Sequence, residues 1–164
     1  MNPTTLVLLT GGAMCLMAGG YLLLLLRLWP RVFLRRFPEE VRNAVPPLTS
    51  RERGLGFAVT LPLLIMLLGF PVWIAAHLHG LGVSGFGVLF TASFAVWMMF
   101  NLFDWLILDE LVVGRLRPSW LVLPGAEQVP LRFDRAEHAR SFVKGSVGGV
   151  IICALIAAGV LLVG

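Results

Sequence analysis

The polar side chains that could do chemistry are few in this chain, and most of them fall in one stretch. Asn101 and Asp104 lie three residues apart, so they share a face of a helix, and Asp109 and Glu110 follow shortly after. Two carboxylates and the imidazole of His138 are groups that can bind a divalent cation or perform acid–base work at a membrane surface. Adjacent residues point about 100° apart on an α-helix, so Asp109 and Glu110 do not form a recognised ligand pattern. We therefore predict a polar cluster of Asp109, Glu110 and His138 and no metal.

A second candidate cluster joins two apolar segments. Arg27 ends the first apolar segment, and Asp104 lies at the same distance from the outer end of a later one. Ionisable groups close to hydrocarbon tend to pair, so we predict an Arg27–Asp104 ion pair beside Asn101, bordered by Trp29 and Trp105. The alternatives are two independent interfacial residues, or a cluster that moves a proton, an ion or a substrate.

Sequence motifs of the common enzyme classes are absent. The chain has no nucleotide-binding glycine loop, no G-x-S-x-G, no C-x-x-C and no HExxH. We expect no cofactor, and the absence of these motifs argues against an enzyme.

The elements that position these side chains are predicted from composition. Of 164 residues, 58% are hydrophobic and only 13% are charged, with a net charge of +4. Soluble domains are about 25% charged, so a soluble domain, a disordered chain and a nucleic-acid-binding domain are excluded. Two cysteines exclude a disulfide framework. An integral membrane protein remains.

Charge-free stretches define the spans. They cover residues 2–26, 54–103 and 145–164, and a bilayer core needs about 20 helical residues per crossing. The middle stretch fits two helices joined by a turn at 77–82. We predict an all-α membrane protein, a single domain over 1–164 folded as a four-transmembrane-helix antiparallel bundle. Its helices are expected at about 5–29, 55–77, 83–116 and 135–163.

The basic residues predict the orientation. All thirteen lie in or beside two connections, 30–54 and 117–134. Basic residues remain on the cytoplasmic side, so both connections should be cytoplasmic and both termini should lie outside the cytoplasmic (inner) membrane. A basic face attracts anionic headgroups. Membrane lipids are therefore the expected partners, with a homo-oligomer or a membrane complex possible and nucleic acid excluded.

The two connections differ in pattern. Pro38-Glu39-Glu40 predicts a short surface helix over 38–45, and Thr49-x-x-Glu52 matches a capping box that starts the next helix. In the other connection, residues 120–123 and 129–133 flank Pro124-Gly125, which predicts two extended segments in a hairpin-like arrangement.

Small residues at four-residue spacing predict close helix contacts. We expect the first and last helices to run antiparallel, with their cysteines at similar depth. The cysteines are interpreted as packing residues, with a redox pair or a metal site as alternatives. The predicted packing residues are Gly11, Cys15 and Gly19 in the first helix and Gly145, Gly149, Cys153 and Ala157 in the last.

Four stretches together resemble a group of small bacterial four-helix integral membrane proteins that is uncharacterised. They are 46–53, 101–109, 121–127, and Asp134 with His138, Phe142 and Gly145. The resemblance implies a bacterial cytoplasmic membrane and brings no activity with it. It leads us to expect aromatic residues where this chain has Glu110 and Glu137.

Three functions follow from these patterns. The chain is interpreted first as a structural, accessory or small-ligand- or lipid-binding membrane protein, because the middle of each span is almost wholly apolar. The second is an oligomeric channel or transporter with Arg27, Asn101 and Asp104 at its cytoplasmic mouth. The third is a membrane-surface enzyme that uses the carboxylates and His138 on a lipid or isoprenoid.

Overall fold

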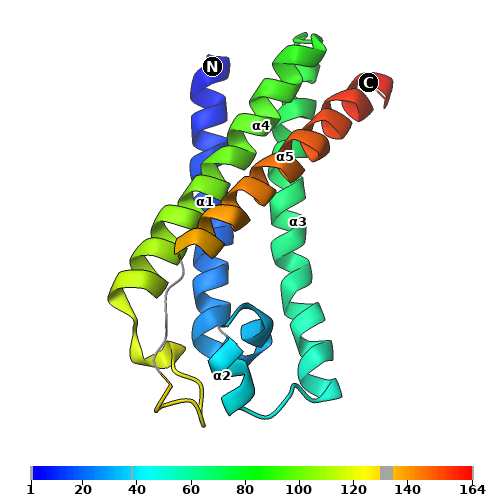
Figure 1. Ribbon diagram of the computed structural model, residues 1–164. Helices are drawn as coiled ribbons and strands as arrows, with labels where there is room; N and C mark the ends of the chain where they lie inside the picture. Colours follow the sequence, from blue (N-terminus) through cyan, green and yellow to red (C-terminus); the bar gives the residue numbers. More distant parts are fainter. Residues whose placement is uncertain (1, 38, 130–134, 164) are drawn as a thin grey trace.

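Four long apolar helices make up most of the molecule (Figure 1). The computed structural model describes residues 2–37, 39–129 and 135–163, and those residues contain no β-strand. Each long helix is sufficiently long and apolar to cross a membrane when the third is counted to Leu116. The predicted all-α architecture is thus confirmed. The helices are α1 (Pro3–Leu28), α3 (Ser50–Gly80), α4 (Phe86–Phe103) and α5 (Arg135–Val163).

The first connection is folded into short helical turns. It begins with a 3-10 helix, η1 (Pro30–Arg36), and continues with α2 (Glu39–Ala44), which matches the predicted surface helix within the described residues. The predicted capping box is also present: Glu52 N–H donates to Thr49 Oγ1 (3.2 Å), and Thr49 N–H donates to Glu52 Oε2 (2.8 Å). This cap starts α3 at Ser50, ahead of the predicted start at residue 55, because it satisfies N–H groups of the first turn.

The third long helix changes its hydrogen-bond pattern halfway. After Phe103 the chain continues as a π-helix, η2 (Asp104–Leu116), and Arg117, in the left-handed region (φ 41°), ends it before Pro118. The predicted helix over 83–116 is right in extent, apart from its start at residue 86. Its second half has a different geometry. In a π-helix the N–H of residue i+5 bonds to the carbonyl of residue i, so each turn holds more residues than an α-helical turn, and residues five apart lie closer to one face than they do in an α-helix.

The connection after η2 differs from its prediction. Residues 119–121 form a 3-10 helix, η3 (Ser119–Leu121), in place of the first extended segment. Leu121 N–H bonds to the carbonyl of Pro118 (2.9 Å), and the Leu121 side chain is buried, so burial favours the tight turn. The turn at Pro124-Gly125 is present, with Gly125 at φ 92°. Residues 130–133 of the second segment lie outside the described residues.

The main core forms around α4. This helix contacts α1, α3 and α5, and α3 likewise contacts the three other long helices. Side chains from all four helices are completely buried there, which excludes water from the middle of the bundle. They include Met14 and Ala18 of α1, Ile74 of α3, Leu89 and Val96 of α4, and Ala157 of α5.

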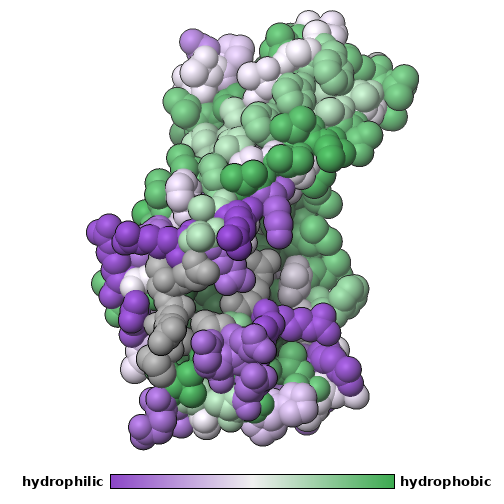
Figure 2. Space-filling model, viewed as in Figure 1, coloured by the Kyte–Doolittle hydropathy of each residue, from purple (hydrophilic) through white to green (hydrophobic). Residues whose placement is uncertain are grey.

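A second, smaller core joins the two connections. Leu34 and Val41 from the first connection pack with Leu123 and Ala126 from the other, and Phe37 covers them. We call residues 30–48 and 119–129 the connection cap. It lies at the end of the molecule opposite to both termini (Figure 1). The hydrophilic side chains gather at the same end, whereas apolar side chains cover most of the visible surface of the helices beyond it (Figure 2).

Candidate functional site

Asn101 is held by α5. Its side-chain N–H group donates to the carbonyl of Phe142 (3.1 Å) and to Ser146 Oγ (3.0 Å). One turn earlier, the indole N–H of Trp97 donates to the carbonyl of Gly145 (3.0 Å). Hydrogen bonds between helices are a main source of association within a membrane, where no hydrophobic gain is available. This polar contact therefore fixes α5 against α4.

The small residues of α5 allow that contact. A Cβ at Gly145 would collide with the Asn101 amide, and a Cβ at Gly149 would collide with the Trp97 ring. Further along the same face, Cys153 and Ala157 are fully buried. The predicted stripe on α5 therefore lies at a buried helix face, and its partner at Gly145 and Gly149 is α4.

The stripe on α1 also contacts α4. A Cβ at Gly11 would collide with the Met99 side chain, and one at Gly19 would collide with the Phe103 ring. Cys15, between them, is half-buried against the main core. The glycines of both stripes therefore receive side chains of the same helix, α4.

The cluster predicted at the polar end is divided between two partners on α5. The Nδ1 atom of His138 lies 2.7 Å from Asp109 Oδ2, and both side chains are half-buried. Glu110 Oε2 lies 3.7 Å from Nε of Arg135, whose side chain is 74% exposed. Asp109 and Glu110 both belong to η2, so two contacts connect the π-helix to the first turns of α5.

Arg27 and Asp104 are not brought together. The ion pairs between described residues do not include one from Arg27 to Asp104, and Arg27 is exposed at the end of α1. Asp104 is half-buried at the start of η2 and makes another interaction. Asn101, the third member of the predicted cluster, is engaged with α5 as described above.

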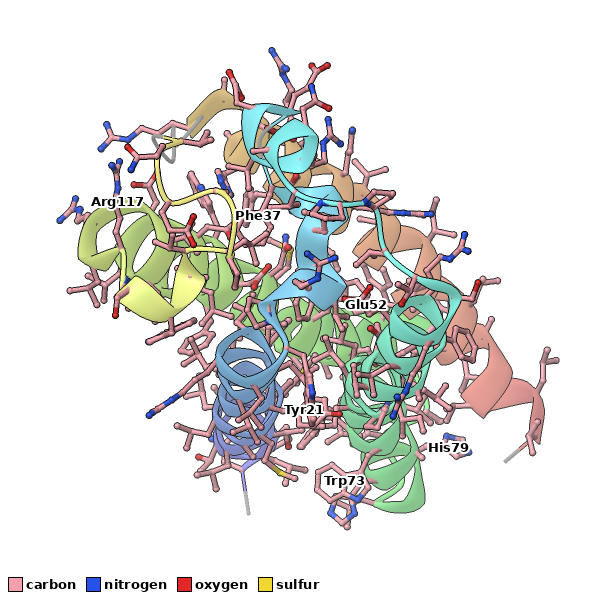
Figure 3. All side chains as sticks on the ribbon, turned by 90° about the horizontal axis from the view of Figure 1, so that it is seen from below. Tyr21, Phe37, Glu52, Trp73, His79 and Arg117 are labelled. Carbon is pink, nitrogen blue, oxygen red and sulfur yellow. The ribbon has the colours of Figure 1, made fainter. Side chains whose placement is uncertain are left out.

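Sequence reasoning missed the role of Arg31. Its Nε donates to Glu52 Oε1 (2.7 Å), while the second carboxylate oxygen of Glu52 caps α3. Arg31 also donates to the carbonyl of Pro46 (3.2 Å). One guanidinium thus joins η1 to the start of α3. The signal was available, because a capping-box glutamate uses only one of its two oxygens in the cap. Figure 3 shows the molecule from this end and labels Glu52. Phe37 lies among the side chains of the connection cap, and Arg117 lies at the edge of the molecule in this view.

Glu127 stabilises the turn of the connection cap. Both of its carboxylate oxygens lie 3.0 Å from the backbone N–H of Gly125. This hydrogen bond favours the ionised form and lowers the pKa of Glu127 below its usual value. The carboxylate is therefore charged at neutral pH, and with Glu39 and Glu40 it makes three carboxylates beside the four arginines of the cap.

A groove runs along the outer side of η2. It has a volume of about 320 Å³ and combines apolar side chains with one anion and one cation. The Trp105 indole N–H is buried and finds no hydrogen-bond acceptor among the described residues, while its ring lies 4.7 Å from the Phe142 ring. The lining residues are Trp105, Leu106, Ile107, Glu110, Leu111 and Arg115.

A second groove lies at the opposite end, between α3 and α5. Its volume is about 510 Å³, and its lining is almost wholly apolar apart from His79, whose buried Nδ1 atom has no hydrogen-bond partner among the described residues. It is lined by Val72, Ala76, His79, Gly80, Ile156, Gly159, Val160 and Val163.

Metal chemistry and family membership find no support in these observations. Within the described residues, no group of three histidine, cysteine or carboxylate side chains is placed to hold a metal ion.

Comparison with family models, curated proteins and solved structures found no match to this chain. The site must be interpreted from its own geometry.

Proposed function

We propose that this chain is a four-pass protein of a bacterial cytoplasmic membrane and an accessory protein that binds phospholipid at its cytoplasmic face. In this proposal the four helices run antiparallel, the connections lie in the cytoplasm and both termini lie outside. The observation that carries the proposal is the position of all thirteen basic residues, which fall in or beside the two connections.

The electrostatics support lipid contact at that end. Each arginine or lysine near an anionic bilayer surface contributes about 1 kcal/mol of attraction. Arg35, Arg42 and Arg51 are exposed around the connection cap. Arginine forms paired hydrogen bonds to phosphate oxygens, so these side chains are suited to contact phosphodiester groups.

The interior supports an accessory role over transport. Among the described residues, the buried polar side chains of the bundle are those of Thr10 and Ser93. Thr10 donates to the carbonyl of Leu6 (2.7 Å) and Ser93 to the carbonyl of Pro71 (3.0 Å). Both hydroxyls are satisfied by backbone, so they leave no polar path for an ion.

Native mass spectrometry of the protein released from phosphatidylglycerol-containing vesicles tests the proposal. The triple variant Arg35→Gln, Arg42→Gln and Arg51→Gln should retain less phosphatidylglycerol than the unmodified chain. The matched control, Glu39→Gln with Glu40→Gln, makes the same end more positive and should retain more. Equal retention by all three proteins would contradict lipid binding at the basic end.

Acid–base chemistry on a lipid or isoprenoid headgroup is a second candidate function. It is favoured by the 2.7 Å contact between His138 and Asp109, since a carboxylate that orients an imidazole is a common general-base arrangement. Incubation of the protein with total membrane lipid should then yield a product, detected by mass spectrometry, that the His138→Gln variant does not form. Identical lipid profiles for the two proteins would exclude this candidate.

A further inference from the structure

The π-helix aligns side chains that an α-helix would separate. Trp105, Glu110 and Arg115 are spaced by five residues, the repeat of the π hydrogen bond, and all three line the groove on η2. In an α-helix, residues five apart do not share a face. The change of helix type at Asp104 therefore brings an indole, a carboxylate and a guanidinium to one groove.

We propose that this groove binds the headgroup of phosphatidylethanolamine, a zwitterionic phospholipid, from the inner leaflet. The proposal rests on the function proposed above, because it needs this end of the bundle at the cytoplasmic surface. Arg115 binds the phosphate, Glu110 binds the primary ammonium, and the Trp105 ring packs against the glycerol ester region.

The charges of the groove favour a zwitterion over a simple anion. A phosphate at Arg115 would be repelled by the Glu110 carboxylate unless a cation lay between them, and the ethanolamine ammonium supplies that cation. The competing contact of Glu110 is with Arg135 at 3.7 Å, and the Arg135 side chain is largely exposed, so this pair is weak and can be displaced.

The position of the groove along the helix also fits a phospholipid. The 18 residues of α4 rise about 27 Å, close to the roughly 30 Å of a bilayer core, so η2 begins at the interface. The apolar lining residues 105–107 come first and the charged ones follow, which is the order of ester and headgroup. Tryptophan is enriched at this depth because its ring is apolar and its N–H is polar.

The volume sets the size of the ligand. About 320 Å³ is at the small end of ligand pockets, so the groove holds a headgroup and leaves the acyl chains on the apolar surface of the bundle. Leu106, Ile107 and Leu111 are exposed beside the groove and provide that surface.

The test measures lipid binding by native mass spectrometry of the full chain in detergent with added phosphatidylethanolamine, phosphatidylcholine or phosphatidylglycerol. Phosphatidylethanolamine should bind more tightly than phosphatidylcholine, whose quaternary ammonium cannot donate a hydrogen bond. Glu110→Gln and Arg115→Gln should each weaken phosphatidylethanolamine binding by about tenfold or more, the value of one charge-assisted hydrogen bond. Trp105→Phe keeps the ring and should have a smaller effect in the same direction.

Two control variants separate the groove from general charge. Arg140→Gln removes an exposed cation of α5 outside the groove and should leave phosphatidylethanolamine binding unchanged. Arg135→Gln removes the competitor of the ammonium and should leave binding equal or tighter, whereas a merely structural Glu110–Arg135 pair would make Arg135→Gln as damaging as Glu110→Gln. Folding is checked by the melting temperature of each variant.

The outcomes distinguish this inference from the proposed function. Equal binding of phosphatidylethanolamine and phosphatidylcholine, or no loss with Glu110→Gln in a folded protein, would overturn the groove proposal. The phosphatidylglycerol response to the arginine variants around the connection cap is measured separately, so lipid binding at the basic end can stand while the groove proposal fails.

Discussion

The two faces of α4 show two ways to bring helices close together. Towards α1, the approach at Gly11 and Gly19 is filled by Met99 and Phe103, which are apolar side chains. Towards α5, the approach at Gly145 and Gly149 is filled by Asn101 and Trp97. Both of these donate hydrogen bonds to α5.

The difference shows that close approach of two helices does not by itself fix which of their residues face each other. An apolar side chain such as Met99 can change rotamer and still fill the space above a glycine. The Asn101 and Trp97 donors each need an acceptor at a fixed position, because an unmade hydrogen bond in hydrocarbon is costly. We infer that the α4–α5 contact sets the register of the bundle, and that the α1–α4 contact tolerates adjustment.

The largest expected effect is at Gly149. Gly149→Leu places a side chain where the Trp97 ring lies and should lower the free energy of unfolding by about 3 kcal/mol, the upper part of the overpacking range. Thermal melting in detergent measures the loss. Gly148→Leu is the matched control, because a Cβ there meets no atom within 4 Å. Equal melting temperatures for the two variants would contradict tight packing at this face.

A smaller effect is expected at Asn101. Asn101→Leu removes two hydrogen bonds to α5 while keeping the side-chain volume close, and should cost about 1–2 kcal/mol. Ser146 retains its own bond to the carbonyl of Phe142 (2.9 Å), so it is not left unsatisfied. Measured by the same melting assay, an unchanged or raised melting temperature would remove Asn101 as a determinant of the contact.

The smallest effect is expected on the other face. Gly11→Ala should cost less than about 1 kcal/mol, because the displaced atoms of Met99 belong to a flexible side chain. Gly12→Ala, whose Cβ meets nothing within 4 Å, provides the baseline. A loss at Gly11 as large as that for Gly149→Leu would show that the two faces of α4 do not differ.

The sequence was sufficient for features that depend on local pattern. The extents of the long helices follow from hydropathy and charge, and the start of α3 follows from Thr49 and Glu52. The glycine stripes correctly predicted close approach. They did not predict the partner helix, because a small residue shows that some helix comes near and not which one.

Other features depend on three-dimensional placement. The predicted Arg27–Asp104 pair used depth alone, whereas pairing also depends on the rotation of each helix about its axis. The π-helix changes backbone hydrogen bonds without a distinctive side-chain pattern. The spacing of an α-helix therefore did not predict that Trp105, Glu110 and Arg115 line one groove. The connection cap did have a signal: Leu34 and Val41 are apolar residues close to arginines and glutamates, and Leu123 ends an apolar run over 120–123.

The sidedness of the chain is the most direct test of the account. Fusions of alkaline phosphatase, active only outside the cytoplasm, and green fluorescent protein, fluorescent only inside it, are made after Gly164, after Gly82 and within the connection cap after Gly125. We expect phosphatase activity for the first two and fluorescence for the third. Fluorescence from the fusion after Gly164, or phosphatase activity from the fusion after Gly125, would contradict this expectation.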